Sequence, residues 1–374
     1  MNGEPEKTNN SGWDGDYETQ ENGCGEGGDE LGTKSEGARQ VPGRWRDPRK
    51  PVAFWIEPDA LDGQEVRAAV LLLRTRGCSW ARCTMCGYHR EAAPAGGEDV
   101  LAQFRTWLER VGAERVAKLY TSGSFFDGRE IPADTRLIIL EEAGRRFERV
   151  VVESRPEFLT EEALRDAINK CPQLEVAIGL ESASPRVLEW SVRKGLTPAD
   201  FERAAGLVHR MGARVRSYVL LKPPFLTELE ALEDAVASIL RAAPLSDVVS
   251  LNPVNVQRGT LVERLWRLGL YRPPWLWTAA ECIAKAVNYA GAAGAHGPRL
   301  VCAPSGAGSP RGAHNCGSCD DAVTRALRNF SISQSAGDLK TVIEKGCACM
   351  DEWRHTLALG LLTHLNHDAL LRAF

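Results

Sequence analysis

Three cysteines within nine residues are the strongest chemical signal in this sequence. Cys78, Cys83 and Cys86 lie in the stretch 76–88, directly after an apolar run. Four thiolates close a structural zinc site, whereas an iron–sulfur cluster held by only three leaves one iron open to a small molecule. The spacing therefore predicts a cluster whose free iron binds a substrate or cofactor. A loop of reduced cysteines without metal is the alternative.

Small and charged residues follow three later apolar runs. A short turn that contains glycine lets the backbone approach a polar ligand closely, and a carboxylate beside a buried strand is costly unless a ligand or partner satisfies it. A plain turn and a structural salt bridge are the alternatives. The candidates in the stretches 120–127, 153–157 and 178–184 are Ser122, Gly123, Ser124, Glu153, Arg155 and Glu181.

Two further loops carry amide and cationic groups that could hold a substrate. One is the stretch 222–225, in which two consecutive prolines make a rigid wall, and the other is 252–260. The candidates on the substrate side are Lys222, Asn252, Asn255, Gln257 and Arg258.

A second group of cysteines lies late in the chain. Cys316 and Cys319 form a C-x2-C pair, and Cys347 and Cys349 form a C-x-C pair, with 27 residues between the two pairs. Four thiolates suit tetrahedral zinc, which would stabilise a loop-rich region that is short of core. A second iron–sulfur cluster is the rival because it uses the same ligands. His314 could replace one thiol, and Cys302 is spare in either case.

The elements that position these residues alternate regularly. Each strand is an apolar run, which argues for a parallel sheet with crossover helices and for reactive groups on the loops after the strands. We expect a partial (βα)6 barrel, with a doubly wound open sheet as the alternative. The strands are expected at 68–74, 116–121, 149–153, 174–180, 215–221 and 247–251, and the helices at 100–111, 135–147, 161–169, 185–192, 198–211 and 228–242.

Composition divides the rest of the chain. Residues 1–43 hold ten acidic and three basic side chains, so the net charge of −4 leaves +3 for the remainder, and this stretch is expected to be a disordered tail. Residues 44–66 are expected to be a linker or N-terminal extension; its basic, Trp-containing start, 44–50, could touch RNA or be a solvated linker. The barrel is placed at 67–259, and a small, α-rich, Cys-rich, zinc-binding domain at 260–374, with a loop-rich stretch at 291–312 and a last helix at 350–371.

No run reaches the 18 or more apolar residues of a membrane span, and the acidic N-terminus is unlike a secretory signal. The sequence therefore predicts a soluble, cytoplasmic protein with no membrane partner. In that compartment, the eleven cysteines are expected to be metal ligands and buried thiols rather than disulfides.

The cysteine loop resembles the cluster-binding motif of radical S-adenosylmethionine (SAM) enzymes, usually C-x3-C-x2-C with an aromatic residue before the last cysteine. Here the first gap is four residues long, and Met85 replaces the aromatic residue. In combination, C-T-M-C-G-Y, T-S-G-S-F, E-S-R-P-E, G-L-E-S and the late cysteines resemble the archaeosine-forming radical SAM enzymes (RaSEA), which are relatives of the catalytic subunit of Elongator. The resemblance covers about residues 50–360.

This resemblance implies roles for the candidate residues. The three loop cysteines would ligate three irons of a [4Fe–4S] cluster, and SAM would chelate the fourth. Tyr88 would pack near the adenine. The stretch Ser122–Gly123–Ser124 would hold the methionine amino group, although serine replaces the usual acid. Residues that would surround the methionine and ribose are Glu153, Arg155 and Glu181, and those placed among the catalytic groups are Glu153, Lys222 and Asn252.

The implied reaction completes archaeosine at position 15 of the tRNA D-arm. A separate lysine-transferring subunit would attach lysine to a 7-deazaguanine, an electron donor would reduce the cluster, and an adenosyl radical would start cleavage of the C–N bond. One alternative is another radical SAM reaction on tRNA, either methylthiolation or the Elongator reaction. The other is a non-catalytic, zinc-containing protein that binds tRNA or acts as a scaffold.

Overall fold

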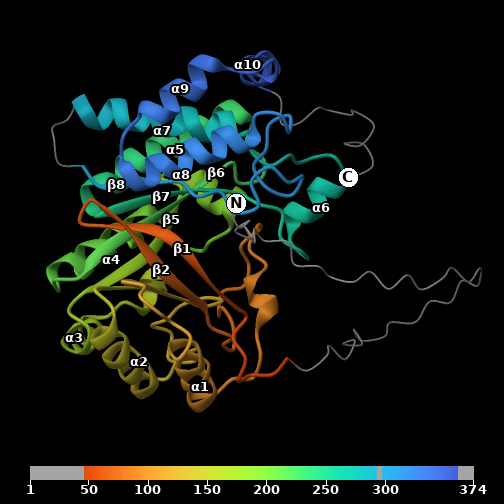
Figure 1. Cartoon of the computed structure of the whole chain (residues 1–374). Helices are drawn as coiled ribbons and strands as arrows, with labels where there is room; N and C mark the ends of the chain where they lie inside the picture. The colour runs from red at the N-terminus through yellow and green to blue at the C-terminus, as the bar shows by residue number, and fades with distance from the viewer. Residues whose placement is uncertain (1–45, 293–296, 361–374) are drawn as a thin grey trace, which may run out of the picture. The chain divides into compact units, whose positions relative to one another are not determined.

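One twisted sheet organises the residues that the computed structural model describes, which are 46–292 and 297–360. The acidic tail expected at 1–43 lies outside them. In the described ranges, eight strands pair in sequence order (Figure 1). They are β1 (Ala53–Leu61), β2 (Gln64–Leu72), β3 (Val116–Tyr120), β4 (Arg149–Ser154), β5 (Leu174–Glu181), β6 (Arg214–Leu221), β7 (Val248–Pro253) and β8 (Arg299–Val301).

The strand order identifies the fold as a curled half-barrel. β1 pairs with β2 antiparallel, and every pairing from β2 to β8 is parallel. A doubly wound sheet reverses its strand order at a switch point, and this sheet has no such reversal. The partial barrel predicted from the alternating pattern is therefore confirmed.

The crossover helices cover the outer face of the sheet (Figure 1). On β6, Val215 and Val219 join the helix-facing core, whereas Tyr218 packs against a separate inner cluster formed by strand residues. This division follows from the two-residue period of a strand. The helices are α1 (Gly97–Leu108), α2 (Ala133–Arg146), α3 (Glu161–Lys170), α4 (Pro198–Arg210) and α5 (Glu228–Ala242). Threonine side chains cap the N-termini of α3, α4 and α5.

Two strands lie where the sequence predicted none. β1 falls within the expected linker 44–66 and β8 within the expected loop 291–312. β1 contains Pro58 and exposes Phe54 and Ile56, which is typical of an edge strand and hides its pattern. β8 has only three residues, too few to show any periodicity.

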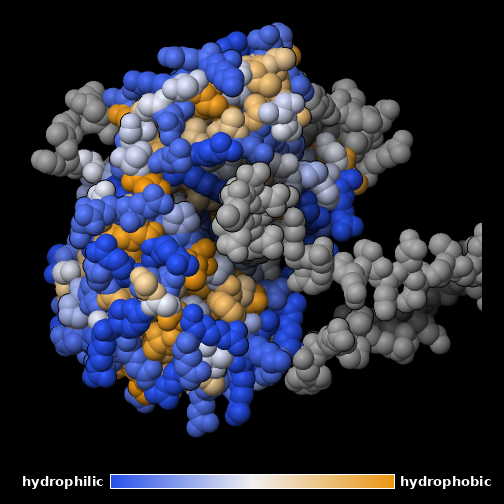
Figure 2. Space-filling view, viewed as in Figure 1, coloured by the Kyte–Doolittle hydropathy of each residue, from blue (hydrophilic) through white to orange (hydrophobic). Residues whose placement is uncertain are grey.

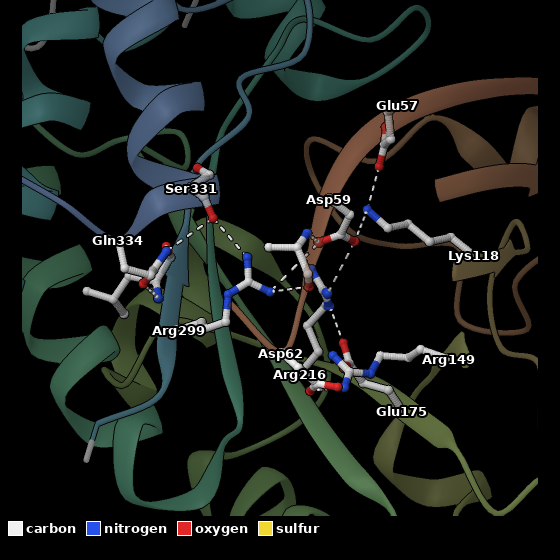
Figure 3. Close-up of polar contacts among 12 residues, drawn as sticks. Glu57, Asp59, Asp62, Lys118, Arg149, Glu175, Arg216, Arg299, Ser331 and Gln334 are labelled. Atoms are coloured by element: carbon white, nitrogen blue, oxygen red, sulfur yellow. Dashed lines mark hydrogen bonds and ion pairs between the residues drawn. The ribbon is translucent and has the colours of Figure 1, made fainter. Parts of the chain in front are cut away.

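A network of ion pairs fills the barrel interior near the N-terminal ends of the parallel strands (Figure 3). Lys118 Nζ lies 2.6 Å from Glu57 and 2.8 Å from Asp59, and Arg216 Nε lies 2.6 Å from Glu175. Arg299, the first residue of β8, donates a hydrogen bond of 2.9 Å to the Ala60 carbonyl of β1. Side chains thus bridge the seam between β8 and β1 and leave the opposite end for the predicted site.

The C-terminal helices pack into the same hydrophobic core as the barrel helices. They are α6 (Leu261–Arg267), α7 (Leu276–Ala292), α8 (Asp320–Ser333), α9 (Gly337–Lys345) and α10 (Cys349–Leu359). Phe330, Leu339 and Trp353 belong to the core that also contains the outer face of the sheet. α10 ends at Leu359, where Gly360 adopts a left-handed conformation. The rest of the helix predicted at 350–371 lies outside the described residues.

Among the described residues, no helix combines the length and the hydrophobicity that a membrane span requires.

Candidate active site and metal centre

The three-cysteine loop begins where β2 ends, at the carboxyl ends of the parallel strands. Cys78, Cys83 and Cys86 are all half-buried and form no disulfide with any other cysteine that the structure describes. Burial raises the pKa of Cys83 to about 11 and that of Cys86 to about 12. These thiols therefore stay protonated near neutral pH unless a bound cation stabilises their thiolates.

A π-helix anchors the middle of this loop. The helix predicted at 185–192 is a π-helix, η3 (Val187–Val192), whose last carbonyls remain available as acceptors. Between Cys83 and Cys86, the backbone N–H of Thr84 donates to the Val192 carbonyl at 3.1 Å, and its hydroxyl donates to the Ser191 carbonyl at 2.6 Å. π-Helical turns are rare and concentrate at functional sites. Here the turn fixes the position of the loop.

Two further contacts hold the loop at its ends. The indole N–H of Trp80 donates to the Arg193 carbonyl at 2.8 Å, and its ring lies so close to Gly195 that a Cβ there would meet ring carbons at 2.2 Å. On the other side, the Gly87 N–H donates to the side-chain oxygen of Gln257 at 2.6 Å. Gln257, expected on the substrate side, thus contacts the cysteine loop itself.

The turn after β3 packs directly against the first cysteine. A Cβ on Gly123 would lie 2.6 Å from Cys78 Cα, so only glycine fits. The neighbouring Ser122 hydroxyl is buried and has no hydrogen-bond partner among the described residues. Buried polar atoms are nearly always paired, so this hydroxyl is available to bind a ligand or a water molecule.

A carboxylate that the sequence did not reveal supports the same turn. Glu130 accepts from the Thr75 hydroxyl at 2.6 Å and from the Ser124 N–H at 2.7 Å. Burial raises the pKa of Glu130 to about 7. No local pattern marks Glu130, because it lies on a loop and reaches Thr75 only through the fold.

Glu153 and two tyrosines line the inner surface of the barrel near its mouth, which is the end where the cysteine loop follows β2. Tyr218 hydrogen bonds to Glu153, and also to Tyr120 of β3. Burial raises the pKa of Glu153 to about 7, so both of its protonation states are accessible near neutral pH. Tyr88 also borders this region: the residue is 46% exposed, and desolvation raises the pKa of its hydroxyl to about 12.

Arg155 is held in one orientation by its neighbours. Its guanidinium donates to Glu157 at 2.6 Å and to the Lys194 carbonyl at 3.2 Å, and lies 5.3 Å from the centre of the Trp80 ring. Glu181 has a left-handed backbone, with φ of 66°, and forms an ion pair with Lys194. These contacts fit both the ligand-binding and the structural-salt-bridge interpretations of the two residues.

The substrate-side candidates are more scattered. Lys222 is 2% exposed and its Nζ lies 2.6 Å from Glu228, so its charge is already paired beneath the surface. Asn252, on β7, is half-buried and accepts from the Ser250 hydroxyl at 3.0 Å. Asn255 accepts from Gln257 at 3.3 Å, and Arg258 is exposed.

The four late cysteines converge on one point. Their sulfur atoms all lie within 4.8 Å of one another, and three separations are 3.6 Å, 3.7 Å and 3.9 Å. Four sulfurs about 2.3 Å from a tetrahedral ion would be spaced about 3.8 Å apart. The cysteines are Cys316, Cys319, Cys347 and Cys349.

Protein donors support these sulfurs. The Trp277 indole donates to Cys349 Sγ and the Asn315 amide to Cys319 Sγ, each at 3.3 Å. Neither His314 nor Cys302 joins the group. Cys302 is buried, and His314 Nδ1 lies 2.8 Å from the Gly312 carbonyl. The group therefore resembles a closed metal site with all of its ligands from the protein.

The basic segment at the start of the barrel uses its charges locally. Arg46 pairs with Glu91, Arg49 with Asp99, and Lys50 with Asp47. These pairs fit the solvated-linker interpretation of 44–50, of which residues 44 and 45 lie outside the described ranges.

Comparisons with known proteins agree with this architecture. Residues 72–236 match the Radical SAM superfamily. "Archaeosine synthase subunit beta" of Methanosarcina acetivorans is 38% identical over 84% of this chain and 92% of its own length. The protein of the same name in Thermococcus kodakarensis is 37% identical over 83% of this chain and 98% of its own length.

A solved structure of Elp3 from Methanocaldococcus infernus, with an N-terminal deletion, covers 67% of this chain and 60% of its own, at 18% identity and a TM-score of 0.45, too low to carry an argument. The two sequence relatives show the family of this chain, because each is matched over most of its length. This chain belongs to the radical SAM superfamily and, within it, to the family of archaeosine synthase subunit beta.

Proposed function

We propose that this protein is the radical SAM subunit of an enzyme that modifies tRNA and completes archaeosine at position 15 of the D-arm. The observation that carries the proposal is the three-thiol loop at the carboxyl ends of the strands of a half-barrel. Beside it lies the buried Ser122 hydroxyl, which has no hydrogen-bond partner within 46–292 and 297–360. The names of two relatives, matched over most of their lengths, supply the product. tRNA is found in the cytoplasm, where we place the reaction.

The residues present fit a [4Fe–4S] cluster and SAM. Cys78, Cys83 and Cys86 would hold the cluster, while Ser122 and the backbone at Gly123 would bind polar atoms of SAM. When bound, these groups would supply the radical chemistry that starts cleavage of the C–N bond between the lysine and the deazaguanine. Other proposed SAM contacts are Tyr88, Ser124, Arg155 and Glu181.

The chain's own residues orient the reactants and exclude water. Glu153, held by Tyr218 inside the barrel, has an acid strength suited to exchanging a proton near neutral pH. Asn252 on β7 offers an amide on the same inner side. Lys222 is already paired with Glu228, so we propose that it acts by fixing the loop that follows β6. We assign the substrate as a 7-deazaguanine that carries lysine, supplied by a lysine-transferring partner subunit; an electron donor completes the system.

We further propose that the four late cysteines bind one zinc ion. Three sulfur separations of 3.6–3.9 Å, with all six within 4.8 Å, suit a single tetrahedral ion, whereas a four-iron cluster holds its thiolates further apart. Metal analysis of anaerobically purified protein tests both sites together. We expect about four irons and one zinc per chain. About eight irons without zinc would favour a second cluster.

One assay tests the function. The cluster-loaded protein is incubated with SAM, a reductant and tRNA bearing lysine on its deazaguanine, and both 5′-deoxyadenosine and the nucleosides of digested tRNA are measured. We expect archaeosine and 5′-deoxyadenosine to form together, and neither to form when Cys78, Cys83 and Cys86 are all serine.

Other results would favour the alternatives. 5′-Deoxyadenosine accompanied by a different nucleoside would point to another radical SAM reaction on tRNA, such as methylthiolation or the Elongator reaction. Protein that contains zinc, retains no iron after reconstitution and still binds tRNA would be a non-catalytic scaffold.

A further inference from the structure

Two large aromatic side chains stand exposed beside the three-cysteine loop. Trp190, on the π-helix η3, is 70% exposed, and Phe225, on the loop after β6, is 53% exposed. On the face shown in Figure 2, hydrophilic residues predominate and apolar residues form separate patches. A tryptophan this exposed is unusual, since the indole is among the most costly groups to leave in water.

Hydrogen bonds join the backbone segments that carry the two aromatics. Ser191, next to Trp190, donates to the carbonyl of Pro224, which precedes Phe225. The Ser191 carbonyl in turn accepts from Thr84 of the cysteine loop. The cysteine loop, η3 and the loop after β6 are therefore contiguous, and Trp190 and Phe225 stand on the last two.

Phe225 combines a strained backbone conformation with an exposed side chain. Its φ is +72°, a region that side chains larger than asparagine rarely occupy. Such conformations cost free energy and persist mainly at functional sites. Burying the ring would at least offset that cost, but the ring faces solvent. The strain therefore indicates a role in contacting a ligand.

The charges around these aromatics are mostly positive. Four segments carry the cysteine loop and the two aromatics or contact that loop: 73–91, 184–195, 222–227 and 254–260. Their one exposed carboxylate is Glu189. Arg82 lies 5.2 Å from the centre of the Trp80 ring, and Trp80 also bonds to the carbonyl of Arg193. The exposed arginines are Arg76, Arg82, Arg90, Arg186, Arg193 and Arg258.

We propose that Trp190 and Phe225, with Arg82 and Arg193, form the surface that holds unpaired nucleotides of the RNA substrate beside the mouth; this rests on the proposed function. Enzymes that act on a base must take it out of its stack, and single-stranded RNA is held by aromatic rings under the bases and by cations on the phosphates. The aromatic side chains replace stacking partners that the target nucleotide and its neighbours lose.

The test measures binding of a fluorescent tRNA transcript to the full-length protein by anisotropy, without turnover. Trp190→Ala and Phe225→Ala are each expected to weaken binding roughly five- to hundredfold, the range for a lost base–aromatic stack. Trp190→Phe should restore most of the affinity, and Phe225→Leu should not, because leucine is apolar but has no aromatic face. Phe54→Ala is the matched control, since Phe54 is 45% exposed on β1, and it should bind as the wild type does.

Charge is tested separately. Arg193→Gln should reduce the slope of log affinity against log salt by about 0.7–0.9, the value for one released counterion. Unchanged affinity in a folded Trp190→Ala/Phe225→Ala double variant overturns the assignment. So does a double variant that binds tRNA normally and instead loses association with a partner subunit.

The outcome also separates this proposal from the proposed function. If the wild type binds tRNA and forms archaeosine while the aromatic variants match it in affinity, only the surface assignment fails. If the wild type binds no tRNA, both fail.

Discussion

The two groups of cysteines differ in how the chain holds them. The four late thiols already lie within 4.8 Å of one another, with α8 and α10 beginning at or beside them. The three early thiols lie on an irregular loop that η3, the turn after β3 and Gln257 hold from outside. A closed structural site needs all its ligands fixed by the protein. An open site needs room for a ligand, so its support must come from residues around the thiols.

The largest effect is expected from the open site. Cys83→Ser should reduce formation of 5′-deoxyadenosine by at least about a thousandfold, because the cluster that supplies the radical loses a ligand. The free energy of unfolding should change little, since Cys83 itself belongs to none of the buried hydrophobic clusters. Iron content, product formation and thermal unfolding are measured on the same preparation. A Cys83→Ser protein with full iron and full turnover would contradict the open-site assignment.

Loss of a ligand from the closed site should instead lower the free energy of unfolding. Cys319→Ser is expected to lower the free energy of unfolding by roughly 3–5 kcal/mol, because binding of a structural metal is coupled to folding. Denaturant unfolding and zinc content provide the measurement. Cys302→Ala is the control: it removes a buried thiol outside the group and should keep its zinc. If Cys319→Ser matches this control in both quantities, the cluster has no structural role.

Glu130, which bonds to the turn beside Cys78, should make the free energy of unfolding depend on pH. Its pKa is raised from 4.5 to about 7, so the native state binds the proton more tightly than the unfolded state. In cluster-free protein, Glu130 should therefore contribute a fall in stability of roughly 3 kcal/mol as pH rises from about 4.5 to 7, and no further fall above that range. Glu130→Gln should remove this fall.

Asp234, which accepts a hydrogen bond of 2.7 Å from the Ser182 hydroxyl, supplies the control for this measurement. Burial raises its pKa from 3.8 to about 6, so the loss removed by Asp234→Asn should occur at lower pH. Identical pH profiles for wild type and Glu130→Gln would show that Glu130 does not titrate in this range.

The smallest effect is expected at the π-helix. Thr84→Val removes the hydroxyl that donates to the Ser191 carbonyl but keeps the shape of the side chain, at a cost of about 1 kcal/mol. We expect iron to be lost a few times faster in the presence of a chelator. Thr341→Val removes a similar bond, to the Gly337 carbonyl, on the exposed surface of α9 and should leave the rate unchanged. Equal rates in both variants would mean that η3 does not hold the loop.

The sequence predicted the parts of this molecule that repeat or that depend on residue type. Buried strands such as β4 and amphipathic helices such as α4 carry a local period, and Cys316 and Cys319 carry a recognisable spacing. The pairing of Thr75 with Glu130, 55 positions apart, has no such signal. The π-helical geometry of η3 was also hidden, since the spacing of its apolar residues is that of an ordinary α-helix. Its contact with Thr84 becomes visible only in the folded chain.

The network inside the barrel restricts how this chain can change. Lys118 lies between Glu57 and Asp59, and Asp59 also faces Arg216 and Arg299 at 4.0 Å and 3.8 Å (Figure 3). Neutralising one member leaves a buried opposite charge without compensation, which costs more than replacing a pair together. Substitutions at these positions should therefore be inherited jointly, and an alignment of relatives should reveal them as covarying columns.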